Sequence, residues 1–162
     1  MKNRSIIKGK PITLDIPVEL SCKCEYALLA LLELAAQYNE GEPLQIRQIA
    51  AQQNIPDRYL EQLLATLRRG GLVKSQRGAK GGYILAREPW KITLLEVINC
   101  LEGLDAKSSE EEANHKTVES AVVQEIWQEA HQAANLVLQK CTLQTLCDQR
   151  IARRQLDIMY YI

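Results

Sequence analysis

The stretch from Ile55 to Ala86 constrains the fold of this 162-residue chain more than any other segment. Residues 57–69 repeat apolar side chains at helical spacing, namely Tyr59, Leu60, Leu63, Leu64 and Leu67. A glycine pair then stops the helix, and two short strands, 72–76 and 83–85, flank a basic turn rich in glycine. The stretch therefore predicts a helix with one buried face, followed at once by a small basic hairpin.

A second short helix precedes this stretch. Residues 45–53 have one apolar face at helical spacing, formed by Ile46, Ile49 and Ala50, and a break that ends at Pro56 follows. Two short helices joined by a tight turn make a helix-turn-helix, whose second helix reads base edges in the major groove of DNA. With the hairpin as its wing, residues 20–90 are predicted to form a winged helix-turn-helix head that binds double-stranded DNA.

Charge is distributed unevenly along the chain, although the formal net charge is zero. Residues 1–87 hold 13 Lys and Arg against 8 Asp and Glu, whereas residues 88–162 hold 7 against 12. A basic front half suits contact with phosphates. The sequence has no apolar run near the roughly 20 residues of a membrane span, and its start lacks the apolar core of a secretion signal. We therefore expect a cytoplasmic protein with reduced cysteines.

The rest of the chain is predicted to be mainly α-helical, apart from two irregular segments. Residues 1–19 predict an extended N-terminal arm. Residues 26–36 are apolar almost all round, which predicts a buried central helix that Ser21 would cap near its start. In the C-terminal helical region, 91–162, the polar segment 103–116 is expected to form a mobile loop.

A long helix predicted over residues 117–140 carries a regular apolar stripe. Its members follow a 4-4-4-3-4 spacing close to that of a coiled-coil seam, and they are Val118, Val122, Ile126, Ala130, Ala133 and Val137. A head this small does not need so long a stripe, so pairing with a second copy explains it better, although packing within one chain is the open alternative. We expect a homodimer held by this helix, with a last helix following over 142–159.

Motifs that would indicate an enzyme are absent from the sequence. The glycine-rich turn lacks the Gly-Lys-Ser/Thr ending of a phosphate-binding loop, and no nucleophile elbow or paired-carboxylate site occurs. We therefore expect a DNA-binding regulator rather than an enzyme. A winged-helix module that binds only protein is a further alternative, and the basic front half argues against it.

Four segments resemble the Rrf-two family of bacterial winged-helix transcriptional regulators, which includes IscR, NsrR and CymR. They are LSCKCEYALLALLELA, IRQIAAQQNIPDRYLEQLLATLRRGGLVKSQRGAKGGYILA, ITLLEVINCLEG and TLQTL, and together they span residues 20–150. The resemblance implies a dimeric transcription factor with a long crossing helix at the dimer interface. We expect such a homodimer to bind a roughly palindromic operator in a sequence-specific manner.

The resemblance also assigns DNA-contacting positions. The family's wing arginine, which enters the minor groove, falls on Arg77, and its base-reading positions fall on Arg58, Tyr59, Glu61 and Gln62. The chemistry agrees, because Gln62 can pair with adenine and Glu61 can accept a hydrogen bond from cytosine. Helical phase could instead place Tyr59 in the core.

Phosphate contacts are expected from further basic residues and from the glycines of the turn. Solvated surface charge is the alternative for the basic set, which comprises Arg47, Arg68, Arg69, Lys74 and Lys80. Gly78, Gly81 and Gly82 would let the backbone approach a phosphate closely.

Five cysteines raise the question of a sensor. The resemblance implies three cluster-binding cysteines in the loop before the long helix, yet residues 103–123 hold none, and His115 is the one soft ligand there. We therefore expect no certain cofactor, and the alternative is a thiol or iron–sulfur sensor that uses Cys22, Cys24 and His115. Cys22 and Cys24 lie near a helix N-terminus, which lowers a thiol pKa. Core or interface packing is expected for Cys100, Cys141 and Cys147.

Overall fold

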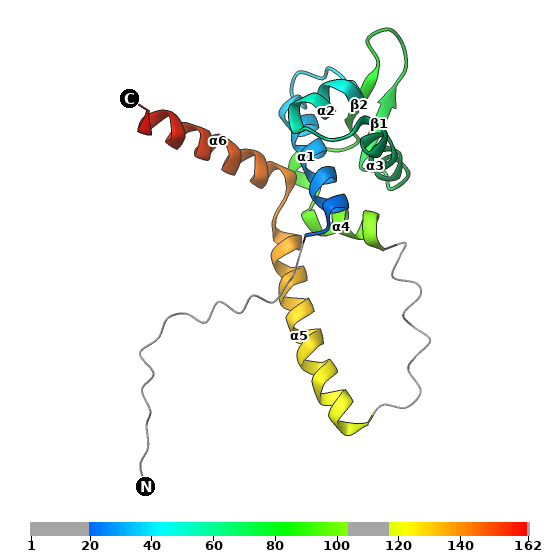
Figure 1. Ribbon diagram of the computed structural model, residues 1–162, viewed down its shortest axis with the longest axis vertical. Helices are drawn as coiled ribbons and strands as arrows, with labels where there is room; N and C mark the ends of the chain where they lie inside the picture. The colour runs from blue at the N-terminus through cyan, green and yellow to red at the C-terminus, as the bar shows by residue number, and fades with distance from the viewer. Residues whose placement is uncertain (1–19, 104–116, 162) are drawn as a thin grey trace.

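The computed structural model describes residues 20–103 and 117–161. The predicted arm, 1–19, and all but the first residue of the predicted loop, 103–116, lie outside these ranges. The elements are, in chain order, α1 (Cys22–Ala36), α2 (Ile46–Gln53), α3 (Asp57–Arg69), β1 (Val73–Gln76), β2 (Gly82–Leu85), a short 3-10 helix η1 (Pro89–Lys91), α4 (Leu94–Glu102), α5 (Val118–Lys140) and α6 (Leu143–Tyr160). Figure 1 shows a head formed by α1 to α4 and the hairpin, from which α5 and α6 project in different directions.

Helix α1 runs through the middle of the head. Because its sequence is apolar almost all round, it is covered on several sides, and α2, α3, α4, β2 and α6 all contact it. Ala27, Ala30 and Leu31 are completely buried. The Ser21 side chain accepts a hydrogen bond of 3.2 Å from the Cys24 amide, which confirms the predicted cap.

Helices α2 and α3 form the predicted helix-turn-helix. Asn54 adopts a left-handed conformation, with φ 52°, at the end of α2, and it turns the chain sharply. Ile55 is then buried, and Pro56 precedes α3 as its N-cap. Helix α3 begins and ends at the predicted residues. Its inner face is buried as the spacing predicted, at Leu60, Leu63, Leu64 and Leu67.

The hairpin is joined to the helix-turn-helix by backbone hydrogen bonds. Strands β1 and β2 are antiparallel, with Gln76 opposite Gly82. Leu44, just before α2, extends this pairing, because its amide and carbonyl bond to those of Tyr83 at 3.0 and 2.8 Å. Strand β1 begins one residue later than predicted, at Val73, and β2 one residue earlier, at Gly82.

The C-terminal arm, residues 117–161, is attached to the head near the α5–α6 connection. Backbone hydrogen bonds of 2.9 and 3.0 Å join Cys141 and Leu143 to residues 92–94. Leu143 and Cys147 of α6 are buried on the head, whereas α5 has no buried residue. The two predicted C-terminal helices are thus confirmed, and they leave the head as an exposed arm.

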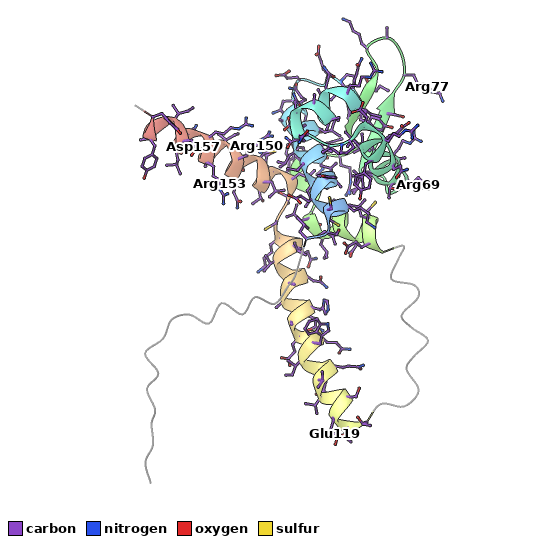
Figure 2. All side chains as sticks on the ribbon, in the orientation of Figure 1. Arg69, Arg77, Glu119, Arg150, Arg153 and Asp157 are labelled. Atoms are coloured by element: carbon purple, nitrogen blue, oxygen red, sulfur yellow. The ribbon has the colours of Figure 1, made fainter. Side chains whose placement is uncertain are left out.

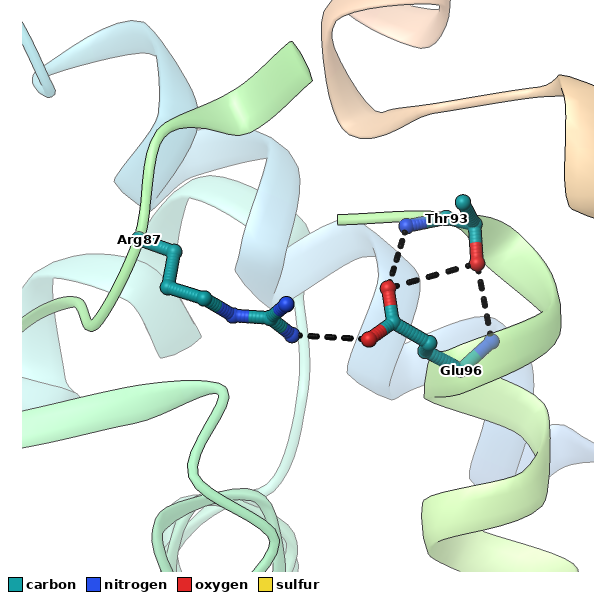
Figure 3. A network of polar contacts seen from close by, with 3 residues as sticks. All are labelled: Arg87, Thr93 and Glu96. Atoms are coloured by element: carbon teal, nitrogen blue, oxygen red, sulfur yellow. Dashed lines mark hydrogen bonds and ion pairs between the residues drawn. The ribbon is translucent and has the colours of Figure 1, made fainter. Parts of the chain in front are cut away.

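A polar network links the end of the wing to α4 (Figure 3). Glu96 lies in the first turn of α4, and its Oε2 accepts hydrogen bonds from the Thr93 amide and hydroxyl at 3.0 and 3.3 Å. Its Oε1 pairs with the Arg87 guanidinium at 2.9 Å. Partial burial raises the pKa of the Glu96 carboxyl, but the hydrogen bonds from Thr93 and Arg87 outweigh burial, and the net pKa is lowered.

We expect this carboxylate to make stability depend on pH. A carboxyl with a lowered pKa stabilises the fold above its unfolded pKa, near 4.5, and this contribution is lost as the pH falls through the folded pKa. Replacing Glu96 by Gln should lower the free energy of unfolding at pH 7 by less than about 1 kcal/mol, since Arg87 and Glu96 are both 41% exposed. The difference in stability between wild type and variant should shrink below pH 4.5. Thermal unfolding followed by circular dichroism at each pH measures it.

The Glu40→Gln variant, at an exposed position, is the matched control and should leave the free energy of unfolding at pH 7 close to that of wild type. A Glu96→Gln deficit of equal size at pH 7 and pH 3 would contradict the assignment.

Candidate nucleic-acid interface

The exposed face of α3 carries three of the predicted base-reading residues. Arg58, Glu61 and Gln62 are exposed, and their side chains make no hydrogen bond or ion pair to any residue within 20–103 and 117–161. They lie in the first half of α3, the part of a recognition helix that faces base edges. Their hydrogen-bonding groups are therefore available to another molecule.

Tyr59 lies between the surface and the core. It is half-buried, and its ring meets that of Tyr26 edge-to-face, with the ring centroids 5.7 Å apart. The alternative that helical phase places Tyr59 in the core therefore holds in part, because the ring packs beside the core while the residue keeps some exposure. Its contact with a base stays a prediction.

The wing presents Arg77 at the exposed start of its turn, as Figure 2 shows. Gly78 has φ +116°, a conformation that residues with a side chain rarely adopt. A Cβ at Gly81 would collide with a carbonyl oxygen of β1, and one at Gly82 with the carbonyl oxygen of Leu44. The close approaches of the chain to itself therefore account for two of these glycines. The predicted approach to a phosphate stays a prediction.

All five residues of the predicted phosphate-contacting set are exposed. Two of them are partly engaged within the chain, because Arg68 donates to Ser75 Oγ at 3.3 Å and Arg69 donates to Thr66 Oγ1 at 3.2 Å. The other three side chains bond to no residue of the described ranges, and they are Arg47, Lys74 and Lys80. The set spans α2, α3 and the hairpin, which are the elements predicted to contact a duplex.

A groove between α2 and the wing was not foreseen from the sequence. It has a volume of about 290 Å³, and Gln45, Gln48 and Lys80 are among its lining residues. The Gln48 side chain accepts a hydrogen bond of 2.8 Å from the Gln45 amide, in the manner of a capping box. The Gln-x-x-Gln spacing could have indicated this cap, but it carries no sign that a wing lysine lies beside it.

The candidate sensor residues are not brought together. Cys22 is exposed, whereas Cys24 is buried. The Cys24 thiol donates a hydrogen bond to Glu102 Oε1 at 3.3 Å, and the Ser21 hydroxyl donates to the same oxygen at 2.9 Å. Burial raises the pKa of the Cys24 thiol more than the Ser21 hydrogen bond lowers it, so the predicted lowering of that pKa is wrong. His115 lies outside the described residues.

A metal centre finds no support in the part of the chain that the structure describes. Within residues 20–103 and 117–161, no group of three or more His, Cys, Asp or Glu side chains could hold a metal ion. These residues therefore do not fit an iron–sulfur cluster, which needs several thiolate or imidazole ligands at one place.

The other three cysteines pack against the core. Cys147 belongs to the core, and Cys100 and Cys141 are half-buried beside it, which agrees with the predicted packing roles. Burial raises the pKa of Cys100 and Cys147. The Cys100 thiol donates to the Thr66 carbonyl at 3.7 Å and lines a cleft of about 640 Å³ between α3 and α4.

Helix α5 exposes a long apolar surface. The large apolar side chains that are more than half exposed on it are Val118, Val122, Val123, Ile126, Trp127, Leu136 and Val137. The described residues of the same chain leave this stripe uncovered, which disfavours the alternative of packing within one chain. No helix of the described ranges is both long and apolar enough to cross a membrane.

Comparison with known proteins gives a family match and close structural relatives. A model of the Rrf2 family, described as an iron-dependent transcriptional regulator, matches residues 20–149. The HTH-type transcriptional regulator CymR of Bacillus subtilis is 36% identical over 149 residues, covering 90% of this chain and 100% of CymR. Among solved structures, T. potens IscR has a TM-score of 0.70 at 35% identity, covering 82% of this chain and 88% of that one. The structure of CymR, the global cysteine regulator of B. subtilis, has a TM-score of 0.69 at 37% identity, covering 82% and 98%.

We expect the two cysteines in the first turn of α1 to react at different rates. Cys22 is exposed, whereas Cys24 is 1% exposed and its thiol pKa is raised. Because the thiolate is the reactive species, iodoacetamide at pH 8 should modify Cys22 at least about tenfold faster than Cys24. Trypsin cleaves after Lys23 and separates the two, so mass spectrometry can follow each rate.

Unfolding the protein in urea is the control, because it should bring the two rates together. Equal rates in the folded protein would show that Cys24 is not protected as its burial indicates.

Proposed function

Because this chain belongs to the Rrf2 family of transcriptional regulators, we propose that this DNA-binding regulator acts in the cytoplasm as a homodimer on a roughly palindromic operator. Family membership confirms the predicted winged-helix fold and the prediction that the protein is not an enzyme, since its relatives are named transcriptional regulators. The observation that carries the proposal is the row of exposed side chains on α3 without partners in the described chain.

Base reading would rest on the first half of α3. In the major groove, Gln62 can make two hydrogen bonds to adenine, Glu61 can accept one from cytosine, and Arg58 can donate two to guanine. Contact with DNA would not cost these side chains an existing bond to the described residues. Tyr59 would add a contact from its exposed edge.

The wing and the basic residues around it would supply affinity that is independent of sequence. Arg77, on an exposed turn, suits a narrow and electronegative minor groove. Arg47, Lys74 and Lys80 are exposed cations that can neutralise phosphates, and Arg68 and Arg69 can add to them while they keep their internal hydrogen bonds. Operator affinity should then fall steeply as the salt concentration rises, because binding releases counterions from the DNA and added salt opposes that release.

The sequence of α5 supports an antiparallel pair of these helices. Val122 and Val137 are equally far from the midpoint between residues 129 and 130, and so are Ile126 and Ala133. Two copies related by a twofold axis at this midpoint would therefore bring Val122 beside Val137 and Ile126 beside Ala133. The alanines would allow the helices to approach closely.

The charges at the two ends of α5 favour the same arrangement. Glu119 lies in the first turn and Lys140 in the last, and they too are equally far from that midpoint. An antiparallel pair would place Glu119 of each copy beside Lys140 of the other, whereas a parallel pair would place like charges side by side. The proposed homodimer is therefore antiparallel at α5.

A thiol-based input is the alternative function. The exposed thiol of Cys22 favours it, whereas the buried Cys24 does not, and a cluster shared with His115 has no support from the described residues. Purification without oxygen, followed by visible absorption and by iron and sulfide assays, tests both versions. Colourless, metal-free protein whose operator affinity does not change with oxidant would exclude a thiol- or cluster-based input and leave the DNA-binding proposal intact.

The Arg77→Ala variant should weaken operator binding about tenfold, a typical effect of losing one groove contact. The operator is first selected from random-sequence DNA with the wild-type protein, and affinity is then measured by gel-shift titration. Thermal stability should not change, because the exposed Arg77 side chain bonds to no described residue.

The Arg153→Ala variant is the control for lost charge, since Arg153 is exposed on α6, far from the wing (Figure 2). Unchanged operator affinity of Arg77→Ala would refute the role of the wing arginine.

The Ile126→Glu variant should make the protein monomeric in sedimentation experiments. Ile126 is 63% exposed within one chain, so the head should stay folded. In the proposed dimer, burying an unpaired carboxylate should raise the dissociation constant at least about a hundredfold.

The matched control is Gln128→Glu, which adds the same charge at an exposed position on the opposite side of α5 and should leave the dimer intact. If Ile126→Glu remains dimeric, the interface is not the α5 stripe.

A further inference from the structure

An ion pair crosses from the head to the C-terminal arm. Glu33 is the charged residue in the otherwise apolar stretch 26–36 of α1, and its Oε1 pairs with Arg150 of α6 at 2.9 Å. The side chains of Glu33 and Arg150 are only 14% and 21% exposed. Gln53, the last residue of α2, donates to the same oxygen. One carboxylate therefore joins the helix-turn-helix, the central helix and the arm.

The ion pair lies beyond the other contacts that hold α6 on the head. Those contacts are the backbone pairing of Cys141 and Leu143 with residues 92–94 and the burial of Leu143 and Cys147. Arg150 lies seven residues beyond Leu143, which is about 10 Å along a helix. Residues 151–160 of α6 are exposed, so the ion pair holds α6 at the far end of its contact with the head. A contact at that distance from the joint limits a swivel of the α6 axis more than the contacts of the first turns do.

The direction of α6 constrains that of α5. The two helices are connected through Cys141 and Thr142 alone, and they leave the joint in different directions (Figure 1). The seat of α6 on the head, together with the contact of α5 with α4, therefore sets how α5 is held relative to the reading helix α3. In a twofold dimer, any swivel at the joint occurs once in each copy, so its effect on the distance between the two reading helices is doubled.

We propose that Glu33 and Arg150 are positioning residues, whose ion pair sets the angle between head and arm and thereby the half-site separation that the homodimer accepts. The inference rests on the proposed function, because half-site separation has meaning only for a dimer on a two-part operator. Each base pair added between half-sites moves them apart by about 3.4 Å along the DNA, so affinity as a function of separation measures the angle indirectly.

The test compares DNA probes in which the two selected half-sites are moved apart or together by one and two base pairs. Wild-type protein should prefer one separation. The Arg150→Met variant should bind that preferred probe about tenfold more weakly and lose most of the preference. Its affinity for a probe with a single half-site should stay within about twofold of wild type, because Arg150 lies on α6 and not on the reading surface.

Three further variants sharpen the comparison. Glu33→Gln removes the charge from the other partner without changing its size, and it should flatten the separation profile in the same way. Arg150→Lys keeps the charge and should restore part of the preference. Arg153→Met is the matched control, since Arg153 is exposed on the same helix and bonds to no described residue, and its profile should equal that of wild type.

Two results would overturn the inference. Equal loss of affinity at every separation and on the single half-site would mean that the pair supports folding or touches DNA. A separation profile that Arg150→Met and Glu33→Gln leave unchanged would mean that the pair does not set the angle. Wild-type protein that prefers no separation would instead refute the proposed dimer on a palindromic operator, so the two failures are distinguishable.

Discussion

Burial of α1 on nearly every side is the constraint on which the rest of the structure depends. A helix this apolar must be removed from water, and α2, α3, α4, β2 and α6 provide the cover. Helix α3, the wing and the arm are thereby all packed against one central helix. The same constraint explains the ion pair between α1 and α6, because Glu33 in such a helix needs a partner once water is excluded. Arg150 and Gln53 supply the partners. The position of Glu33 in the core therefore determines where the arm forms its ion pair with the head.

The parts of the fold that the sequence predicted depend on local signals. Helix α3 was predicted to the residue because its leucine period and the glycine pair after it act within a few residues. The glycine at position 82 is different, since the carbonyl it must accommodate belongs to Leu44, far away in the chain. The contact between Arg150 and Glu33 spans 117 residues. Periodicity and capping rules carry no information about such pairs, and only the packed chain shows them.

In the candidate site, too, local signals predicted some features, whereas others depend on contacts between distant residues. Helical phase was enough to place Arg58, Glu61 and Gln62 on the outer face of α3, because that face is decided by the leucines beside them. For Cys24 the local rule gave the wrong pKa shift. The helix N-terminus and the polar neighbours suggest a reactive thiol, but Glu102, 78 residues away, covers Cys24 and accepts its hydrogen bond. Burial then raises the pKa of the Cys24 thiol more than the Ser21 hydrogen bond lowers it.

The two-part architecture demands a stiff joint if the proposed dimer is right. Binding a second half-site gains affinity through effective concentration only when the geometry lets both heads engage at once, and a loose connection spreads the second head over many positions. The exposed stripe on α5 can bring two copies together, but by itself it does not fix the orientation of α3 in each copy relative to the other. That task falls to the connection at residues 92–94 and 141–143 and to the ion pair beyond it. Backbone hydrogen bonds fix the position of the arm, and the half-buried charges fix its direction, which apolar packing alone would specify less sharply.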